Sequence, residues 1–276
     1  MSKPLAMDEL RALCHRFRGD IMDILHSIQT GHPGGSLSAC EIVTTLYMHK
    51  MNVDPKNPDW EDRDRFVLSK GHAVPILYIV LAELGFFPKS ELKNLRQMGH
   101  MLQGHPSALK TPGIDLSAGP LGLGLSAALG MALAAKVLGK SYTTYALIGD
   151  GEANEGAIWE ALMSANKFKL DNLIPILDYN RVQLDGTTDE IMPLLDISAK
   201  FRAFGMNVIE IDGHDVEAIS DAVDKAKAHK GQTTVIVANT VKGKGISFME
   251  GKSAWHGSPI DTGSYELAKA ELGGAR

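Results

Sequence analysis

A carboxylate and a side-chain amide each follow a strand-like segment of this chain. Asp150 stands between two glycines after the apolar segment 142–148, and Asn180 follows the apolar segment 173–179, thirty positions further along. Either residue alone is typical of a surface turn, but this spacing fits one strand–helix–strand unit, whose strand ends meet at one edge of a parallel sheet. Carboxylate and amide oxygens suit Mg2+, and a helix N-terminus beside them favours phosphate. The pair therefore predicts a metal–diphosphate anchor, with the Val182 carbonyl as a candidate third ligand.

Glycine-flanked loops carry four histidines, which are His32, His72, His105 and His256. One such histidine alone is more typical of a surface or capping residue. Four of them favour a polar site, because imidazoles can hydrogen-bond to sugar hydroxyls and diphosphate oxygens and can move protons near neutral pH. Lys242 and Lys244 lie on a later loop and could meet phosphate, but their pattern is more typical of a solvated basic turn.

The glycine pattern Gly122-x-Gly124-x-x-Ala127 resembles a relaxed dinucleotide fingerprint. That interpretation requires a strand directly before the first glycine, and the preceding residues include a Gly-Pro pair instead. We therefore reject a nicotinamide site and expect either a tight loop that lets backbone approach a ligand or close helix packing. The uncharged segment 116–135 has near-membrane length but is rich in Ala and Gly, which favours a buried helix.

Helical and strand-like segments alternate along most of the chain. Alternation of this kind predicts an α/β fold with a doubly wound parallel sheet and helices on both faces, and nothing divides residues 1–276 into more than one domain. We expect a glycine-rich loop over 30–35 and a capping box at Ser38–Glu41 that opens a helix. The remaining elements are expected at 8–29, 66–68, 73–84, 91–97, 194–204, 207–211, 216–229 and 233–238.

The overall composition is that of a globular protein without a nucleic-acid or membrane partner. The net charge of −5 gives no electrostatic attraction to nucleic acid or to an anionic membrane. Cys14 and Cys40 have neither zinc-ligand spacing nor the pattern of a disulfide framework, so we interpret them as packing residues. The N-terminal segment lacks the features of a signal peptide, and we expect a cytoplasmic protein.

With these motifs identified, the chain resembles the N-terminal, diphosphate-binding half of transketolase. The motifs follow the family's order from about residue 10 to residue 260, and together they are highly specific. They are Gly31-His32-Pro33-Gly34-Gly35, the segment Asp62–Ala73, Gly104-His105-Pro106, the segment Gly119–Gly124, Gly149-Asp150-Gly151 with Asn180, and Trp255-His256-Gly257.

The resemblance implies thiamine diphosphate and Mg2+ as cofactors and assigns roles to individual residues. Asp150, Asn180 and the Val182 carbonyl match the metal ligands. The residues that match cofactor contacts are His72, Gly119, Leu121, Gly151, Glu155, Asn180 and His256, with Glu155 also matching an acid at the subunit contact. The four loop histidines match catalytic positions, His32 and His105 facing the hydroxyls of the ketose.

The resemblance also implies a partner, because transketolases continue into further domains beyond the point where this chain ends. The glutamate that activates the cofactor's pyrimidine ring would come from a separate C-terminal subunit, in an α2β2 heterotetramer acting on sugar phosphates of the pentose phosphate pathway. Two alternatives remain open: a related thiamine enzyme such as 1-deoxyxylulose-5-phosphate synthase, and a non-catalytic subunit that only binds cofactor or partner. The sequence does not identify the ketose donor or the aldose acceptor.

Overall fold

A fully parallel sheet forms the centre of the fold in the computed structural model, which describes residues 4–273. The strand order is β1-β2-β3-β5-β4, and each neighbouring pair is parallel. This confirms the predicted parallel α/β fold. The strands are β1 (Arg65–Leu68), β2 (Thr144–Gly149), β3 (Leu173–Tyr179), β4 (Asn207–Asp212) and β5 (Thr234–Asn239).

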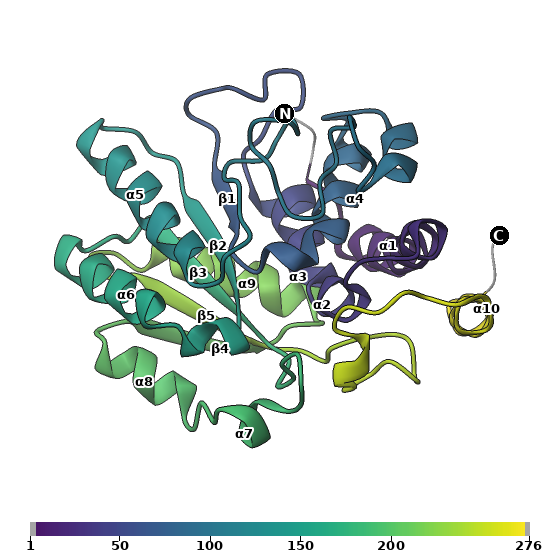
Figure 1. Cartoon of the computed structure of the whole chain (residues 1–276). Helices are drawn as coiled ribbons and strands as arrows, with labels where there is room; N and C mark the ends of the chain where they lie inside the picture. The colour runs from purple at the N-terminus through teal and green to yellow at the C-terminus, as the bar shows by residue number, and fades with distance from the viewer. Residues whose placement is uncertain (1–3, 274–276) are drawn as a thin grey trace.

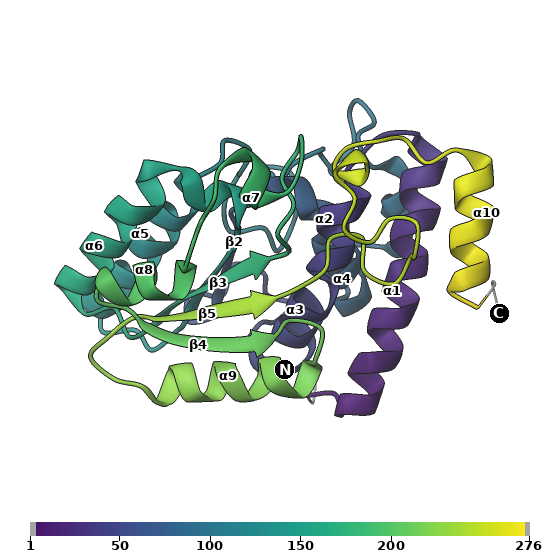
Figure 2. The ribbon, with the colours of Figure 1, turned by 90° about the horizontal axis from the view of Figure 1, so that it is seen from below.

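Helices cover both faces of the sheet (Figures 1 and 2). One layer consists of α5 (Leu123–Val137), α6 (Gly156–Phe168) and α8 (Ile197–Ala203), with the short α7 (Thr188–Ile191) beside the sheet's carboxyl edge. The opposite layer consists of α1 (Met7–Ile28), α2 (Pro33–Ser38), α3 (Cys40–Thr45), α4 (Val74–Leu84) and α9 (Val216–Ala228). Single-turn helices lie at Leu46–Lys50, Gly71–Ala73, Gly151–Asn154 and Ser253–Trp255, and a longer 3-10 segment at Lys89–Asn94.

Alternate residues of the central strands enter two separate cores. In β2, Tyr145 and Leu147 pack with the layer of α1, α4 and α9, whereas Ala146 and Ile148 pack with the layer of α5, α6 and α8. Strands that are buried on both faces are continuous apolar runs, which explains why the β2 and β3 segments could be predicted from sequence. Every residue of β2 is buried, so Asp150, which follows β2, is attached to a well-packed strand.

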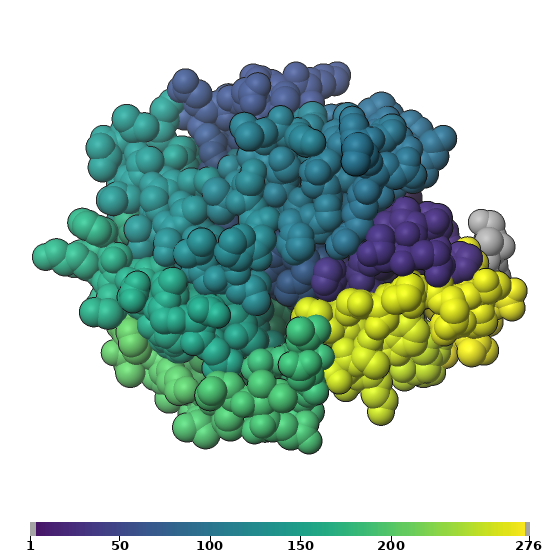
Figure 3. Space-filling view, in the orientation of Figure 1, coloured from purple at the N-terminus to yellow at the C-terminus, as the bar shows by residue number. Residues whose placement is uncertain are grey.

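The C-terminal helix α10 (Thr262–Glu271) packs against the N-terminal helix α1 (Figures 2 and 3). Lys269 Nζ lies 2.9 Å from Asp23 Oδ1, and the ring of Tyr265 stacks on that of His26 with centroids 4.2 Å apart. The segment that carries His256 is therefore tied at its far end to the first helix.

The structure corrects the sequence prediction for residues 30–41. Helix α2 begins at Pro33, inside the expected loop, and Ser38 lies in its last turn. The predicted capping box is wrong, because Ser38 Oγ donates to Asp178 Oδ2 at 2.7 Å and Glu41 pairs with Arg18. Both side chains have tertiary partners that local sequence does not reveal.

Helix α5 covers the sheet and buries only one of its faces. Leu125, Ala128 and Ala132 are fully buried, while Leu123 and Val137 face outward. The predicted buried helix is therefore correct for one face of α5. Among the described helices, none combines the length and apolar character needed to cross a bilayer.

Candidate active site

Asp150 and Asn180 lie next to each other at the carboxyl edge of the sheet, as the sequence predicts. Strands β2 and β3 are adjacent and in register, so the residues that follow them leave the sheet side by side. Asp150 accepts hydrogen bonds from the backbone N–H groups of Gly151, at 2.7 Å, and Arg181. Asn180 Oδ1 accepts one from Val182 N at 3.1 Å. The backbone therefore fixes both side chains.

The oxygen atoms gathered at this edge fit a hard cation such as Mg2+. Asp150, Asn180 and the Val182 carbonyl offer the ligand types that Mg2+ prefers, alongside water and phosphate. The Val182 carbonyl already accepts a cationic donor, the Lys242 ammonium, at 3.0 Å. Burial, with the nearby Asp178 carboxylate, raises the pKa of Asp150 to about 6. A bound cation would favour the ionised carboxylate and offset that effect.

The surroundings of Gly151 fit a diphosphate beside the cation. A Cβ at this position would come within 3.1 Å of Gln183 Cγ, so a larger residue would displace that side chain. Gln183 Nε2 is buried and has no hydrogen-bond partner within residues 4–273. A diphosphate presents many acceptor oxygens, so its binding offers a partner for a donor of this kind.

The structure brings the four predicted histidines into one cluster. They come from four separate segments of the chain, and the distances between ring centroids are 4.9 Å for His72–His256, 5.4 Å for His32–His72, 5.5 Å for His32–His256 and 6.2 Å for His32–His105. His256 also lies 2.7 Å from Lys242 Nζ through its Nδ1 atom. The cluster therefore adjoins the residues at the metal edge.

Burial keeps these imidazoles neutral. It lowers the pKa of His32 to about 4, with a further contribution from Arg96, and the pKa of His256 to about 3, with a further contribution from Lys242. The pKa values of His72 and His105 are lowered as well, again mainly by burial. A neutral imidazole has one donor and one acceptor nitrogen, so each ring can accept a hydrogen bond from one hydroxyl group and donate one to another.

Lys242 is a functional candidate that the sequence named but did not favour. Lys242 is only 2% exposed, so the predicted solvated turn is wrong for this residue. The side chain of Lys244 is 38% exposed, so the prediction is right there. The Lys242 ammonium donates to the carbonyls of Val182, at 3.0 Å, and Gln183, at 3.3 Å, and contacts His256. It thus lies between the metal edge and the histidine cluster.

Lys70 and Asp178 form a buried ion pair beneath the site, also missed from the sequence. Asp178 accepts hydrogen bonds from Lys70, from Thr240 Oγ1 and, at 2.7 Å, from Ser38 Oγ. Burial alone would raise the pKa of Asp178, but the Lys70 charge and these hydrogen bonds outweigh it and lower the pKa. Burial, with repulsion from Lys70, lowers the pKa of Lys242 to about 8. The sequence did contain one indication of this buried ion pair, because Asp178 is an acidic residue inside the apolar run that forms β3.

Glu152 is a second buried acid that the sequence did not single out. Its carboxylate accepts hydrogen bonds from Ser69 Oγ and from the backbone N–H groups of Gly122, at 2.8 Å, and Gly149, at 3.0 Å. Glu152 therefore joins the loops that follow β1 and β2 to the loop before α5. Gly124 belongs to the same packing, because a Cβ there would lie 2.3 Å from Ser69 Oγ.

The loop before α5 presents an open surface. Leu121 is 41% exposed, and apart from Gly119 and its two chain neighbours no described residue has an atom within 4 Å of the position that a Cβ of Gly119 would take. No strand precedes Gly122, which supports the rejection of a dinucleotide site. Glu155 is exposed at the start of α6, with its Cβ 2.8 Å from the Cβ position of Gly122. Cofactor contacts by Gly119, Leu121 and Glu155 remain predictions.

Arg96 lies at the exposed side of the histidine cluster. Its guanidinium is 3.5 Å from His32 Nδ1 and 3.4 Å from Thr30 Oγ1, and it packs over Gly104, where a Cβ would lie 3.0 Å from Arg96 Cζ. No carboxylate pairs with Arg96 within the described part of the chain. The cluster is thus bordered by a buried cation, Lys242, and an exposed one, Arg96.

Comparison with known proteins places this site in a described family. Residues 9–275 match the family described as "Transketolase, thiamine diphosphate binding domain". The chain is 48% identical to the 6-deoxy-6-sulfo-D-fructose transketolase subunit SqwG of Clostridium sp. (strain MSTE9), over 91% of each chain. It is 40% identical to one subunit of the apulose-4-phosphate transketolase of Phocaeicola vulgatus, over 97% of this chain and 95% of that protein.

Larger relatives match over part of their length. The transketolase of Mus musculus is 44% identical over 96% of this chain but only 42% of its own length. A solved transketolase structure from Leishmania mexicana superposes with a TM-score of 0.92 and 33% identity, covering 99% of this chain and 42% of that one. The chain therefore spans less than half of these two transketolases and nearly all of the two subunits.

Proposed function

The chain belongs to the transketolase family as a thiamine diphosphate-binding domain, and we propose that it is the subunit of a two-chain transketolase that holds the cofactor's diphosphate through Mg2+. The observation that carries this proposal is the juxtaposition of three oxygen ligands, a buried ammonium group and four neutral histidines at one sheet edge. Asp150, Asn180 and the Val182 carbonyl are the proposed metal ligands.

Different residues of this chain contact different parts of the cofactor in this proposal. His72, Gly151 and Lys242 face the diphosphate, and the open surface at Gly119 and Leu121 receives the cofactor's thiazolium ring. When bound, thiamine diphosphate supplies the nucleophilic carbon and the electron sink that breaking a ketose C–C bond requires.

His32, His105 and His256 bind the hydroxyls of the sugar. Because these rings are neutral at pH 7, each can accept a hydrogen bond from one hydroxyl while it donates a hydrogen bond to another. Their proposed role is to orient the two-carbon ketol unit and to carry protons during its transfer from a ketose to an aldose.

A separate subunit completes the active site in this proposal. It supplies the glutamate that activates the cofactor's pyrimidine ring, and two copies of each chain form an α2β2 heterotetramer in the cytoplasm. The two subunit relatives act on different substrates by name, a sulfo-fructose and apulose 4-phosphate. We therefore propose a sugar phosphate or a similarly anionic sugar as the substrate class; participation in the pentose phosphate pathway remains a prediction.

The proposal is tested by co-expressing the chain with its candidate C-terminal subunit and measuring ketol transfer with thiamine diphosphate and Mg2+. We expect turnover by the complex, none by the isolated chain, and loss of turnover when a chelator removes the metal. Turnover by the isolated chain would contradict the two-subunit proposal. A complex that binds the cofactor but transfers no ketol unit from any tested ketose would support a non-catalytic subunit instead.

A further inference from the structure

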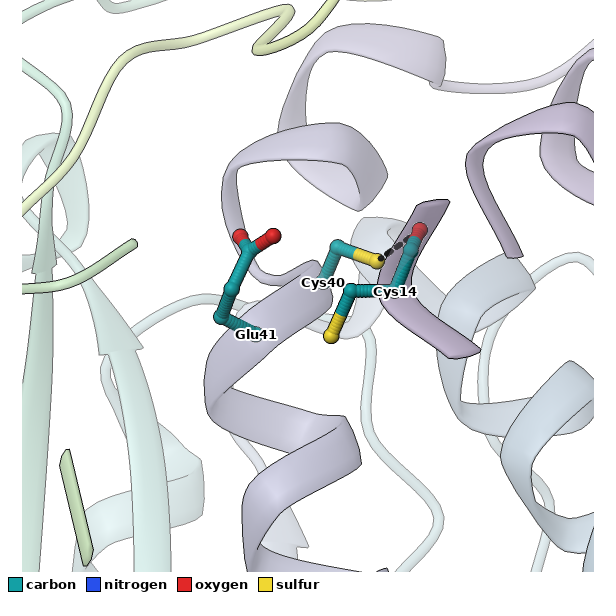
Figure 4. A group of neighbouring side chains, drawn as sticks. All are labelled: Cys14, Cys40 and Glu41. Carbon is teal, nitrogen blue, oxygen red and sulfur yellow. Dashed lines mark hydrogen bonds between the residues drawn. The ribbon is translucent and has the colours of Figure 1, made fainter. Parts of the chain in front are cut away.

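A buried group behind the active site contains two thiols and a carboxylate (Figure 4). Cys14, Cys40 and Glu41 bring their ligand atoms within 4.8 Å of one another, and both thiols are free. This is not a metal site, because the Glu41 carboxylate is already paired with Arg18, at 2.6 Å, and with His214 Nδ1, at 2.8 Å. Burial also raises the pKa of the Cys40 thiol well above its usual value, so the thiolate that a metal would require is disfavoured. The cysteines are packing residues, as predicted.

The Glu41 carboxylate orients Arg18 and His214 towards one backbone segment. Arg18 Nε donates to the carbonyl of Lys244 at 2.9 Å, and the N–H of Val241 donates to His214 Nε2, also at 2.9 Å. Because a backbone N–H can only donate, Nε2 must be the acceptor and Nδ1 must carry the hydrogen that Glu41 accepts. The side chains of Arg18, Glu41 and His214 are only 7–12% exposed, so this geometry is well shielded from water.

The two backbone contacts lie on either side of Lys242. Val241 precedes it and Lys244 follows it by two positions, while the intervening Gly243 adopts a φ of 78° and donates its N–H to Gly34 O at 3.0 Å. A Cβ at Gly243 would lie 2.5 Å from the Met249 carbonyl oxygen, so this turn accepts no larger residue. The backbone of Lys242 is therefore fixed from both sides.

We propose that Arg18, Glu41 and His214 form a positioning network for Lys242. None of the three contacts the proposed metal ligands or the four clustered histidines in the described structure; they act by holding the turn that places the Lys242 ammonium against the Val182 carbonyl and His256. The inference rests on the proposed function, because it gives Lys242 the task of binding the cofactor's diphosphate. Around metal ligands, removing a group that orients a ligand typically weakens the site by about 10- to 100-fold, and we expect a loss of similar size here.

A double-mutant cycle on the assembled two-subunit complex tests the network. The affinity for thiamine diphosphate in the presence of Mg2+ is measured by calorimetry for His214→Leu, Lys242→Met and the double variant. We expect losses of about 10-fold for His214→Leu and about 30-fold for Lys242→Met. The double variant should lose about 30-fold rather than about 300-fold, because His214 acts through Lys242.

Two further variants separate positioning from general stability. His214→Gln keeps an acceptor for the Val241 N–H and should recover most of the affinity, whereas His229→Leu, the same kind of change at the end of α9, should leave the affinity unchanged. If His214→Leu does not fold, Arg18→Met takes its place in the cycle, because it removes the bond to the Lys244 carbonyl.

The inference is overturned if the losses multiply in the double variant or if His214→Leu and Arg18→Met bind the cofactor like the native complex. A native complex that binds no thiamine diphosphate would instead refute the proposed function.

Discussion

The two sides of the histidine cluster differ in how deeply they are buried and in how many hydrogen bonds to the backbone hold them. One side, which we call the anchor, is fixed by backbone hydrogen bonds and is largely buried; it consists of Asp150, Asn180, Val182 and Lys242. The other side, which we call the rim, is open to solvent; it consists of Leu121 and Arg96. The half-buried His32 and His105 lie between them.

This difference separates two tasks. The anchor residues follow β2, β3 and β5, and hydrogen bonds to the backbone hold their side chains in place. The rim exposes an apolar side chain and a cation without a carboxylate partner among the described residues, so its surface is suited to being covered by another molecule. We therefore expect changes at the anchor to affect the cofactor and changes at the rim to affect the substrate.

Replacing Asp150 by Ala should have the largest effect, since it removes the only carboxylate among the three proposed metal ligands. Affinity for thiamine diphosphate with Mg2+ should fall by more than about 100-fold, because even changes beside a metal ligand cost up to about 100-fold. Calorimetry on the assembled complex measures this loss. Asp189→Ala, at an exposed carboxylate on α7, serves as the matched control; equal affinities for the two variants would remove Asp150 from the anchor.

The histidines between anchor and rim should separate turnover from cofactor binding. Replacing His32 or His105 by Ala should lower kcat by about 100-fold, the lower end of the usual contribution of general acid–base catalysis. Cofactor affinity should stay within a few-fold of native, because neither residue contacts the metal ligands. Steady-state kinetics together with cofactor titration measure both quantities. Loss of cofactor binding in either variant would instead assign that histidine to the anchor.

The anchor also shows how far sequence reasoning reaches. The Asp150–Asn180 pair was predictable because two apolar runs at βαβ spacing determine where their ends meet, and the four histidines were recognisable from their glycine-flanked loops. The cluster they form, by contrast, follows from the packing of four separate segments of the chain, and the resemblance to a known family was needed to assign their roles.

Lys242 was not predictable, for a physical reason. A lysine in a glycine-rich turn has the sequence features of a solvated residue, and its burial depends on the carbonyl of Val182, sixty positions earlier. Asp178, Lys70 and Ser38 meet in the same way across more than a hundred positions. Long-range ion pairs of this kind have no local periodicity, so only the folded arrangement reveals them.

Replacing Lys242 by Met should weaken cofactor binding by about 30-fold, because hydrogen bonds that involve a charged group contribute roughly 1.5–3 kcal/mol. The KM for the ketose should change little if Lys242 belongs to the anchor alone. Lys244→Met changes the same residue type two positions away, at an exposed side chain, and should behave like the native protein. An increase in ketose KM with unchanged cofactor affinity would place Lys242 on the substrate side of the cluster.

The smallest effect is expected at the rim, where Arg96 borders the cluster without a carboxylate partner among residues 4–273. Arg96→Gln should raise the KM for a phosphorylated ketose by roughly 3-fold, because an exposed ion pair contributes only about 0.2–1 kcal/mol. For an uncharged ketose of the same length the KM should not change, and the difference should shrink as salt screens the charge. Steady-state kinetics with both ketoses at two ionic strengths measure these effects. Equal changes for the charged and uncharged ketose would mean that Arg96 supports His32 sterically, and the rim would then have no electrostatic part in substrate choice.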